Sequence, residues 1–464
     1  MVPKRVFLKI SFLVVSILPS ILLAAPETII KAKLAEQIRA KGPKTHFIVA
    51  DLETGRTIFE NRAQEKVKPA SVLKILTSTV AMSILGSDYR FRTEFWGDSS
   101  PGKDGSIGNL YIKGGGDPSF TIEDLLMIIR NLKRQGIKKI SKVIYDDFLF
   151  EEATRRVGQR AYEAGPSALS FNFNTISFDV CPTEVGRQAV VLPNPSEVPV
   201  ILSGRILTGS KRKSVYSIDD SGMDTGALGF KLSGQIGKSF GCETVYRSIS
   251  NPPVYFAQSV VGLMNANDIK VTQGSVHGKV SKNGRRLIYH DSKPLSHIIW
   301  DLNHFSTNVI AEQLLYHIGF SNKGGLSREV GIARIGTYLN KLGLQSDDYD
   351  IYDGSGLSRE NRITATLLLR VLRDVYKNQR IWPEFESSLP VGGKSGTLKK
   401  RFKSLKGGIV RAKTGSLNGV ASLAGYITTD KGRRYVFVCI ANGTSIYKAR
   451  QLEEDLVKII VSNQ

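Results

Sequence analysis

Two hydrophobic periodicities alternate near the start of the chain. Residues 46–52 and 57–60 have the composition of β-strands and are separated by turn residues, which predicts a hairpin. Residues 71–85 carry apolar side chains at helical spacing. We therefore expect a strand hairpin followed by a buried helix, with another helix at residues 31–39 before the hairpin.

The middle of the chain follows a different pattern. Residues 95–261 are rich in short strand-like and turn-like pieces, and the part at about 180–250 is polar and rich in Gly and Ser. Helical spacing then returns, and the end of the chain predicts three strands followed by a helix. We predict one domain formed by residues 26–94 and 262–464, interrupted by an inserted domain at 95–261 with a nested module at about 180–250.

The first 25 residues have the pattern of a signal peptide. Lys4, Arg5 and Lys9 precede an apolar run at 10–23, and two alanines follow it. The run is shorter than the roughly 20 apolar residues of a spanning helix. Residues 1–25 therefore predict export to the periplasm or the extracellular cell envelope, with an uncleaved anchor as the alternative.

The net charge of the chain limits the classes of partner that the protein is expected to bind. Lys and Arg number 64 against 42 Asp and Glu, so the formal net charge of the 464 residues is +22. The basic residues are spread along the chain without the concentrated block that marks a nucleic-acid-binding arm, so no nucleic acid partner is expected. The excess is interpreted as a solvated basic surface or as peripheral association with an anionic envelope.

The cysteines and histidines give no metal or cofactor signal. The chain has three cysteines without a CxxC pair, and its six histidines show no HExxH spacing. Cys181 and Cys242 lie in the inserted region, and we hypothesise that they form a disulfide if their Cα atoms approach within about 7 Å. Cys439 lies in an apolar run and is expected to be a buried thiol.

A serine and a lysine suited to nucleophilic catalysis stand at the start of the helix predicted at 71–85. Positions i and i+3 share a helix face, so the Ser71 hydroxyl and the Lys74 amine can meet. A lysine shielded from water can lose its proton and serve as a base. The S-x-x-K pattern also occurs at Ser100, Ser210 and Ser445, but only Ser71 begins a strongly apolar helix.

Two further motifs complete a known catalytic set. Ser306-Thr307-Asn308 lies at a break between two predicted helices, and Lys413-Thr414-Gly415 lies on a predicted strand. S-x-x-K, Ser-x-Asn and K-T-G together are typical of penicillin-binding proteins and class A β-lactamases. Ser306 is expected to transfer a proton, and Asn308 to orient Lys74 and the substrate. Lys413 and Thr414 are expected to bind the substrate carboxylate, and Gly415 to let the substrate approach the strand closely. The N–H groups of Ser71 and Ser416 are expected to form the oxyanion hole.

Several other stretches match these patterns by chance. Ser170-x-Asn172 and Ser416-x-Asn418 also read Ser-x-Asn, and Lys394-Ser395-Gly396 resembles K-T-G. Lys394 precedes a basic, loop-like stretch, so Lys413 is preferred. Ser239 fits the G-x-S-x-G elbow without a strand-to-helix context. His304 is interpreted as a partly exposed residue at a helix end.

The chain resembles the low-molecular-mass class C penicillin-binding proteins, the D-alanyl-D-alanine carboxypeptidase/endopeptidase family. The resemblance runs from about residue 30 to 460 and includes the three motifs, the long gap between the first two, and four further stretches at 110–118, 167–172, 353–359 and 361–364. It implies an α/β penicillin-recognition domain, similar to the serine β-lactamases, whose antiparallel sheet is flanked by helices and which is split by a large strand-rich insertion.

The resemblance also implies partners and one further site residue. Peptidoglycan peptides are the expected substrates, and β-lactams are the expected covalent inhibitors. An acidic residue of the insertion is expected to contact the diamino-acid side chain of the peptide; Asp146 aligns best, although Asp147 is its neighbour. The pair Lys394-Ser395 departs from the family pattern and is interpreted as a substitution without mechanistic consequence.

The expected function is therefore that of a serine DD-peptidase, which cleaves D-Ala-D-Ala ends or D-Ala–diamino acid cross-links through an acyl-enzyme on Ser71. Two alternatives share the motifs: a serine β-lactamase, and a non-catalytic wall-binding or penicillin-sensing protein. The sequence favours neither, because no Glu stands in a class-A-like setting and the catalytic motifs are intact.

Overall fold

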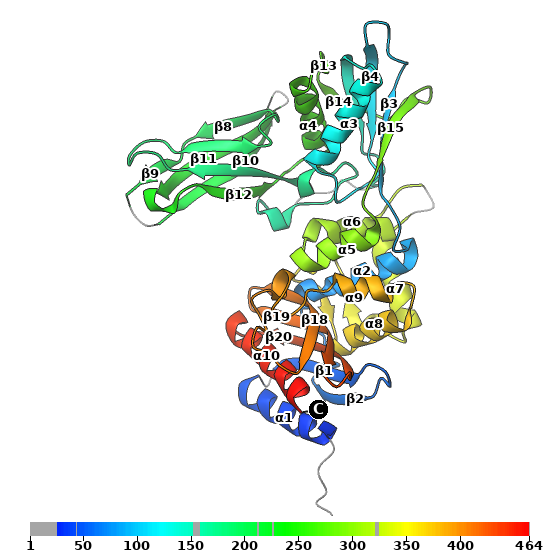
Figure 1. Ribbon diagram of the computed structural model, residues 1–464, viewed down its shortest axis with the longest axis vertical. Coiled ribbons are helices and arrows are strands. Elements are labelled where there is room, and N and C mark those ends of the chain that lie inside the picture. The colour runs from blue at the N-terminus through cyan, green and yellow to red at the C-terminus, as the bar shows by residue number, and fades with distance from the viewer. Residues whose placement is uncertain are drawn as a thin grey trace, which may run out of the picture.

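The two ends of the chain meet in one antiparallel sheet (Figure 1). The computed structural model describes residues 26–42, 44–151, 158–210, 213–224, 227–320 and 324–463, so the predicted signal peptide at 1–25 lies outside the described residues. The sheet has the order β18-β19-β20-β1-β2. Its strands are β1 (Thr45–Asp51), β2 (Thr57–Asn61), β18 (Gly408–Leu417), β19 (Val420–Thr429) and β20 (Arg434–Asn442).

Both faces of this sheet are buried, as the apolar runs of its strands require. On β20, Val438 belongs to a core shared with helices α2 and α8, whereas its neighbour Cys439 belongs to a core shared with α1 and α10. Successive strand residues point to opposite faces, which gives this division. The helices are α1 (Pro26–Lys41), α2 (Lys74–Leu85), α5 (Leu295–Phe305), α6 (Asn308–Ile318), α7 (Arg328–Lys341), α8 (Ala365–Lys377), α9 (Trp382–Ser388) and α10 (Ile446–Ser462). These elements form the core domain, and the short strands β16 (Tyr349–Asp350) and β17 (Arg362–Ile363) pair beside it.

The inserted domain stands above the core domain in Figure 1. Its sheet has the order β13-β5-β4-β3-β15, and β14 also pairs with β5. The elements are β3 (Arg92–Gly97), β4 (Ser106–Lys113), α3 (Ile122–Arg134), β5 (Lys139–Asp146), α4 (Pro252–Ala266), β13 (Lys270–Val271), β14 (Ser275–His277) and β15 (Arg285–Asp291).

The insertion is longer than the range 95–261 predicted from the sequence. β15 pairs with β3, with Asp291 opposite Arg92, so residues 92–94 and 262–291 belong to the inserted domain rather than to the core domain. The physical reason is composition: β15 is polar and only partly buried along its length, and it carries no clear periodic signal.

An arm projects sideways from the inserted domain (Figure 1). One of its sheets consists of β12 (Glu243–Ser248), β6 (Thr175–Cys181) and β7 (Val190–Asn194), and the other of β8 (Val200–Gly204), β9 (Leu207–Gly209), β10 (Val215–Asp224) and β11 (Ala227–Gly237). The predicted disulfide is confirmed: Cys181 and Cys242 are bonded, with Cα atoms 4.1 Å apart. The antiparallel pairing of β6 with β12 brings these two positions together. Cys439 is a buried free thiol, also as predicted.

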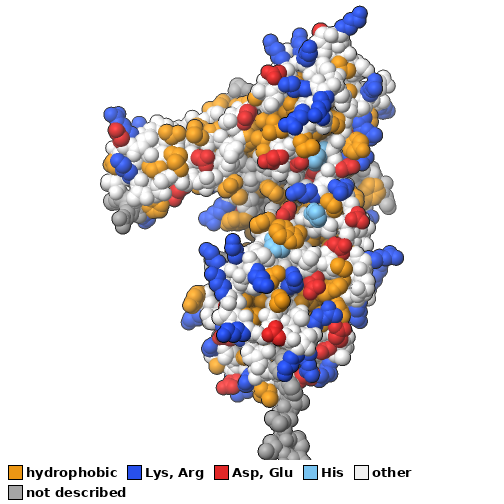
Figure 2. Space-filling model, in the orientation of Figure 1, with side chains coloured by type: hydrophobic (Ala, Val, Ile, Leu, Met, Phe, Trp, Pro, Cys, Tyr) orange, Lys and Arg blue, Asp and Glu red, His pale blue; other side chains and the backbone are white. Residues whose placement is uncertain are grey.

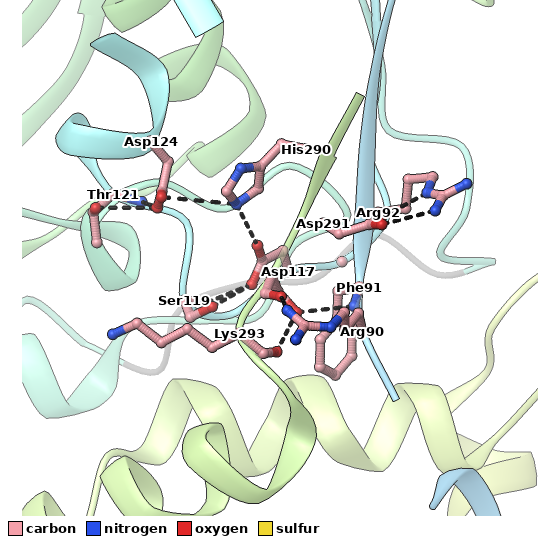
Figure 3. A network of polar contacts seen from close by, with 12 residues as sticks. Arg90, Phe91, Arg92, Asp117, Ser119, Thr121, Asp124, His290, Asp291 and Lys293 are labelled. Atoms are coloured by element: carbon pink, nitrogen blue, oxygen red, sulfur yellow. Dashed lines mark hydrogen bonds and ion pairs between the residues drawn. The ribbon is translucent and has the colours of Figure 1, made fainter. Parts of the chain in front are cut away.

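Polar groups of the inserted domain link its segments at the joint, where the chain passes between the two domains (Figure 3). The Arg92 guanidinium pairs with the Asp291 carboxylate at 2.6 Å. Deeper in the joint, Nε2 of His290 lies 3.7 Å from Asp117 and 3.8 Å from Asp124. Burial raises the pKa of the Asp117 carboxyl to about 7 and lowers the pKa of His290. The joint therefore combines an exposed ion pair with a more deeply buried cluster of titratable groups.

Helix α6 fixes the inserted domain to the core domain. The side-chain amide of Gln313 donates to the carbonyls of Gly116 and Ser167 at 2.9 and 2.8 Å, and its oxygen accepts the Ser167 N–H at 2.6 Å. His317, one turn later, contacts the same Gly116 carbonyl at 3.2 Å. Two loops of the insertion are thus held by the helix that begins at Asn308. Within the described residues, no helix is long and apolar enough to cross a membrane.

Candidate active site

Ser71 lies directly before helix α2, in a 3₁₀ turn at Ala70–Leu73, so α2 begins at Lys74 and not at the predicted Ser71. The first turn still brings the two side chains together: Lys74 Nζ donates to Ser71 Oγ at 2.8 Å. Gly415 of β18 lies directly against this turn. A Cβ added to Gly415 would stand 2.8 Å from the Ser71 nitrogen and 2.3 Å from Ser422 Oγ, so only glycine fits there.

The Lys74 amine is completely buried at the centre of the site. Besides Ser71 it donates to Asn308 Oδ1 and to the Ser355 carbonyl, each at 2.7 Å. Burial lowers the pKa of Lys74 to about 7, against the opposing effect of the carboxylates of Asp353 and Glu312. Near neutral pH a substantial fraction of Lys74 is thus unprotonated and able to accept a proton.

The Ser-x-Asn motif lies at the junction of α5 and α6. Ser306 has a left-handed backbone with φ of 59°, which turns the chain sharply between the two helices. Its hydroxyl accepts a hydrogen bond from Lys413 Nζ at 2.9 Å. Asn308 uses both ends of its amide: Oδ1 accepts from Lys74, and Nδ2 donates to the Tyr162 carbonyl of the inserted domain at 2.6 Å. The inserted domain therefore contributes backbone to this site.

Strand β18 forms the opposite wall. Lys413 is buried and donates to the Thr414 carbonyl at 2.7 Å as well as to Ser306. Its pKa lies well below the usual lysine range, first because of burial and second because Lys74 is near. Thr414 Oγ1 donates to Thr397 Oγ1 at 2.8 Å, and Ser416 Oγ accepts from Arg450 at 2.9 Å.

The structure thus brings together the seven residues of the three predicted motifs and the adjacent Ser416 in one site: Ser71, Lys74, Ser306, Asn308, Lys413, Thr414, Gly415 and Ser416. Lys394, the competing K-T-G position, has an exposed side chain on a loop before a short 3₁₀ turn.

The loop that follows Lys394 nevertheless belongs to the site. No role was predicted for it, yet the hydroxyl of Thr397 accepts a hydrogen bond from Thr414, and Ser395 Oγ lies 3.1 Å from Nε2 of His304. His304 is only 4% exposed, so the expectation of a partly exposed histidine was wrong. The last turn of α5 packs onto this loop and stacks His304 on Trp300, which buries the imidazole and lowers its pKa.

Two partly buried carboxylates close to Lys74 were also not predicted from the sequence. Glu312 accepts the backbone N–H of Ser355 at 2.8 Å, and Asp353 accepts that of Gly356 at 2.7 Å. Together they shape the loop whose Ser355 carbonyl receives Lys74. Burial, and then the charge of Asp353, raise the pKa of Glu312 to about 7. The available signal was the position of Glu312 four residues after Asn308, on the same face of one helix.

Asp146 stands apart from these contacts. It ends β5 in the inserted domain, and its oxygens accept the backbone N–H groups of Phe148 at 3.3 Å and Val280 at 3.0 Å. Its neighbour Asp147 pairs with His277 at 2.5 Å. Among the described residues, the hydrogen bonds of the Asp146 carboxylate stay within the inserted domain.

Comparison with known proteins identifies the family of this chain. The model of the D-Ala-D-Ala carboxypeptidase 3 (S13) family matches residues 30–462. A D-alanyl-D-alanine carboxypeptidase from Actinomadura sp. (strain R39) is 28% identical over 435 residues, covering 89% of this chain and 80% of that protein. The D-alanyl-D-alanine carboxypeptidase DacB of Haemophilus influenzae is 25% identical over 417 residues, covering 87% of this chain and 86% of its own.

Solved structures confirm the predicted fold class. The crystal structure of penicillin-binding protein 4 from Haemophilus influenzae superposes with a TM-score of 0.78 at 23% identity, covering 91% of this chain and 99% of that one. A peptidoglycan endopeptidase from Bdellovibrio bacteriovorus gives a TM-score of 0.53 at 17% identity, with coverage of 90% and 92%. On the family match over nearly the whole described chain, this protein belongs to the D-Ala-D-Ala carboxypeptidase 3 (S13) family.

Proposed function

We propose that the protein is a serine DD-peptidase that cleaves D-Ala-D-Ala ends, or D-Ala–diamino acid cross-links, of peptidoglycan peptides through an acyl-enzyme on Ser71. The observation that carries this proposal is the 2.8 Å contact between Lys74 Nζ and Ser71 Oγ, combined with burial that brings the pKa of Lys74 to about 7. A nucleophile with an adjacent, largely neutral base is the requirement for acyl transfer.

The acylation step follows from this geometry. Neutral Lys74 accepts the Ser71 proton as Oγ bonds to the carbonyl carbon of the penultimate D-Ala. The N–H groups of Ser71 and Ser416 are assigned to the oxyanion that develops. When the tetrahedral intermediate collapses, the C–N bond breaks, and the proton that Lys74 accepted is assigned to pass through the Ser306 hydroxyl, 2.9 Å from Lys413 Nζ, to the leaving amine. Water then attacks the ester carbonyl, Ser71 regains its proton, and the acid product leaves.

Substrate orientation is assigned to the strand wall and to Asn308. Lys413 and Thr414 supply an amine and a hydroxyl for the terminal carboxylate, whose negative charge favours the protonated form of Lys413. The Thr397 hydroxyl lies beside them, 2.8 Å from Thr414 Oγ1. Asn308 is assigned to hold Lys74 and the peptide backbone. Gly415 allows the peptide to lie close to β18, where a side chain would collide with Ser71.

For the diamino-acid side chain we retain Asp146 as the proposed contact. Its two backbone hydrogen bonds use two of the roughly four acceptor positions of a carboxylate, which leaves capacity for an ammonium group. We expect the wild-type protein to cleave peptides that carry the side-chain ammonium faster than peptides that lack it. If Asp146 contacts this group, the Asp146→Asn variant should cleave both peptides equally well. A preference that survives the substitution would remove Asp146 from the site.

Two further parts of the function are proposals. Export to the cell envelope is inferred from the signal-peptide pattern at 1–25, and peripheral envelope association from the formal charge of +22. Covalent inhibition by β-lactams is inferred from the serine and lysine pair; penicillin-binding protein 4 of Haemophilus influenzae has been crystallised in complex with a β-lactam.

Purified muropeptides test the proposal. Incubation with uncross-linked pentapeptides should release D-Ala, and incubation with cross-linked dimers should release monomers if the protein is an endopeptidase. Nitrocefin should acylate the protein slowly and be turned over poorly. Fast nitrocefin turnover without peptide cleavage would favour the β-lactamase alternative, and penicillin labelling without either reaction would favour a sensing role.

A further inference from the structure

A hollow of about 640 Å³ opens on the core domain between α5 and α9. Its lining combines the indole of Trp300 and the imidazole of His297 with charged and hydroxyl side chains, contributed by Lys293, Ser296, Asp301, Glu384 and Ser387. Figure 2 shows apolar, histidine and charged side chains mixed on the near face over α5, below the inserted domain. The mechanism proposed above makes no use of this hollow.

The indole ring of Trp300 is exposed but held firmly. Trp300 is 41% exposed, although one face of its indole stacks on His304 with ring centroids 3.7 Å apart. His304 is itself fixed by the Trp300 carbonyl and by Ser395 Oγ, both at 3.1 Å. Phe305, 65% exposed, approaches the indole edge-on at 6.0 Å. An exposed and preorganised indole is suited to stacking a flat ligand at a low entropic cost.

The hollow contains a hydrogen-bond acceptor that no described residue uses. Glu384 Oε2 is shielded from solvent and has no hydrogen-bond partner among the described residues. Asp301 is partly buried, and burial raises the pKa of its carboxyl, opposed by nearby Lys293, His304 and His297. A shielded acceptor without a partner is costly, and a ligand hydroxyl group would satisfy it.

We propose that this hollow is a saccharide subsite, which binds an N-acetylhexosamine unit of the peptidoglycan glycan strand. A pyranose ring has an apolar C–H face for Trp300 and a rim of hydroxyl groups for Glu384, Asp301 and Ser387. A purely apolar ligand would leave the two carboxylates unpaired, and a polyanion would be repelled by them. The inference rests on the proposed function, because the glycan and the scissile peptide are parts of one polymer.

The hollow lies close to the catalytic site along α5. Trp300 is on α5 and Ser306 directly follows its last residue, and six residues of α-helix rise roughly 9 Å. A stem peptide of about four extended residues spans about 13 Å, which exceeds this rise, so a sugar in the hollow and a peptide at Ser306 can belong to one substrate. Binding the sugar would raise the effective concentration of the attached peptide at the catalytic serine.

Binding is tested first, apart from catalysis. The β-1,4-linked tetramer of N-acetylglucosamine is titrated by calorimetry into the full-length protein whose Ser71 has been acylated with benzylpenicillin, so that the cleft is filled. The tetramer should bind, and Trp300→Ala should weaken its affinity about tenfold or more, as the loss of a stacked aromatic contact does. Tyr447→Ala removes a 78% exposed aromatic of α10 and serves as the matched control, with unchanged affinity.

A second variant and a kinetic comparison guard against a folding defect. Glu384→Ala leaves the indole in place and should weaken the tetramer several-fold. Trp300→Ala should lower kcat/KM for a disaccharide-pentapeptide about tenfold more than for the sugar-free pentapeptide. Absence of tetramer binding at millimolar concentration, or equal affinity in both variants and wild type, overturns the subsite. If wild-type protein cleaves neither peptide, the proposed function fails instead, and the calorimetry still decides the subsite.

Discussion

Lys74 Nζ lies 2.8 Å from Ser71 Oγ and is fully buried behind it. The amine gives its other two hydrogen bonds to Asn308 and to the Ser355 carbonyl, so three separate segments of the chain converge on one nitrogen. Burial favours the neutral amine, and the nearby carboxylates of Glu312 and Asp353 limit how far the pKa falls. This balance places a usable base beside the nucleophile near neutral pH.

The first prediction concerns pH. With the pKa of Lys74 at about 7, the amine is mostly protonated below that pH and mostly neutral above it. The rate constant for acylation by benzylpenicillin should therefore rise as pH rises through about 7 and then level off. Stopped-flow or quenched labelling between about pH 5 and 9 measures this profile, and Lys74→Ala should remove acylation almost entirely. A rate that falls over this range would contradict Lys74 as the base.

The second prediction separates the charge of Glu312 from its hydrogen bonds. Glu312→Gln keeps an acceptor for the Ser355 N–H but removes a negative charge that raises the pKa of Lys74. The midpoint of the pH–acylation profile should move to lower pH. Glu329→Gln, at an exposed position on α7, is the control and should leave the midpoint unchanged. A midpoint that stays in place in Glu312→Gln would show that this charge does not act on the base.

The third prediction compares the two lysines that compete for the K-T-G role. Lys413→Ala should weaken capture of carboxylate-bearing substrates by roughly 1.5–3 kcal/mol, a factor of about 10 to 150, because a charge-assisted contact is lost. Lys394→Ala removes an exposed side chain and should behave like wild type. Values of kcat/KM on a D-Ala-D-Ala peptide provide the readout. If the Lys394 variant were the damaged one, the carboxylate site would lie on the loop and not on β18.

The fourth prediction concerns the arm. Cys181 and Cys242 are 61 residues apart in sequence, and closing a loop of that length is worth about 4 kcal/mol in the chain-entropy model. Thiol titration of the denatured, unreduced protein should find one free thiol, that of Cys439. Cys181→Ser/Cys242→Ser should lower the unfolding midpoint of the arm. Three titratable thiols in protein isolated from an oxidising compartment would contradict the bridge.

The parts of the fold that the sequence predicted are those with a strong period. The strands β1, β19 and β20 and helix α2 carry long apolar runs because they are buried, and β2, β18 and α10 carry the alternating or helical apolar pattern of elements with one buried face. Helix α3 was not predicted. Its buried residues have helical spacing, but they lie in a region that was interpreted as strands and turns; they are Leu125, Ile128, Ile129 and Leu132. The strands at 270–291 are short and polar, so their pairing depends on tertiary contacts.

The catalytic motifs could be predicted because each keeps its chemistry within three adjacent positions or one helical turn. The remainder of the site depends on contacts between distant segments. Thr397 reaches Thr414 across 17 residues, and Tyr162 reaches Asn308 across 146. No local pattern encodes such pairs. His304 was misjudged for the same reason, since the loop that buries it lies 91 residues later in the chain.

The central claim, that Ser71 is the acylated nucleophile, is tested most directly by mass spectrometry of the protein after reaction with fluorescent penicillin. The account predicts one covalent adduct, carried by the tryptic peptide that contains Ser71, and no adduct in Ser71→Ala, although that variant should keep its fold. An adduct on a peptide that contains Ser239 or Ser445, or undiminished labelling of Ser71→Ala, would contradict the account.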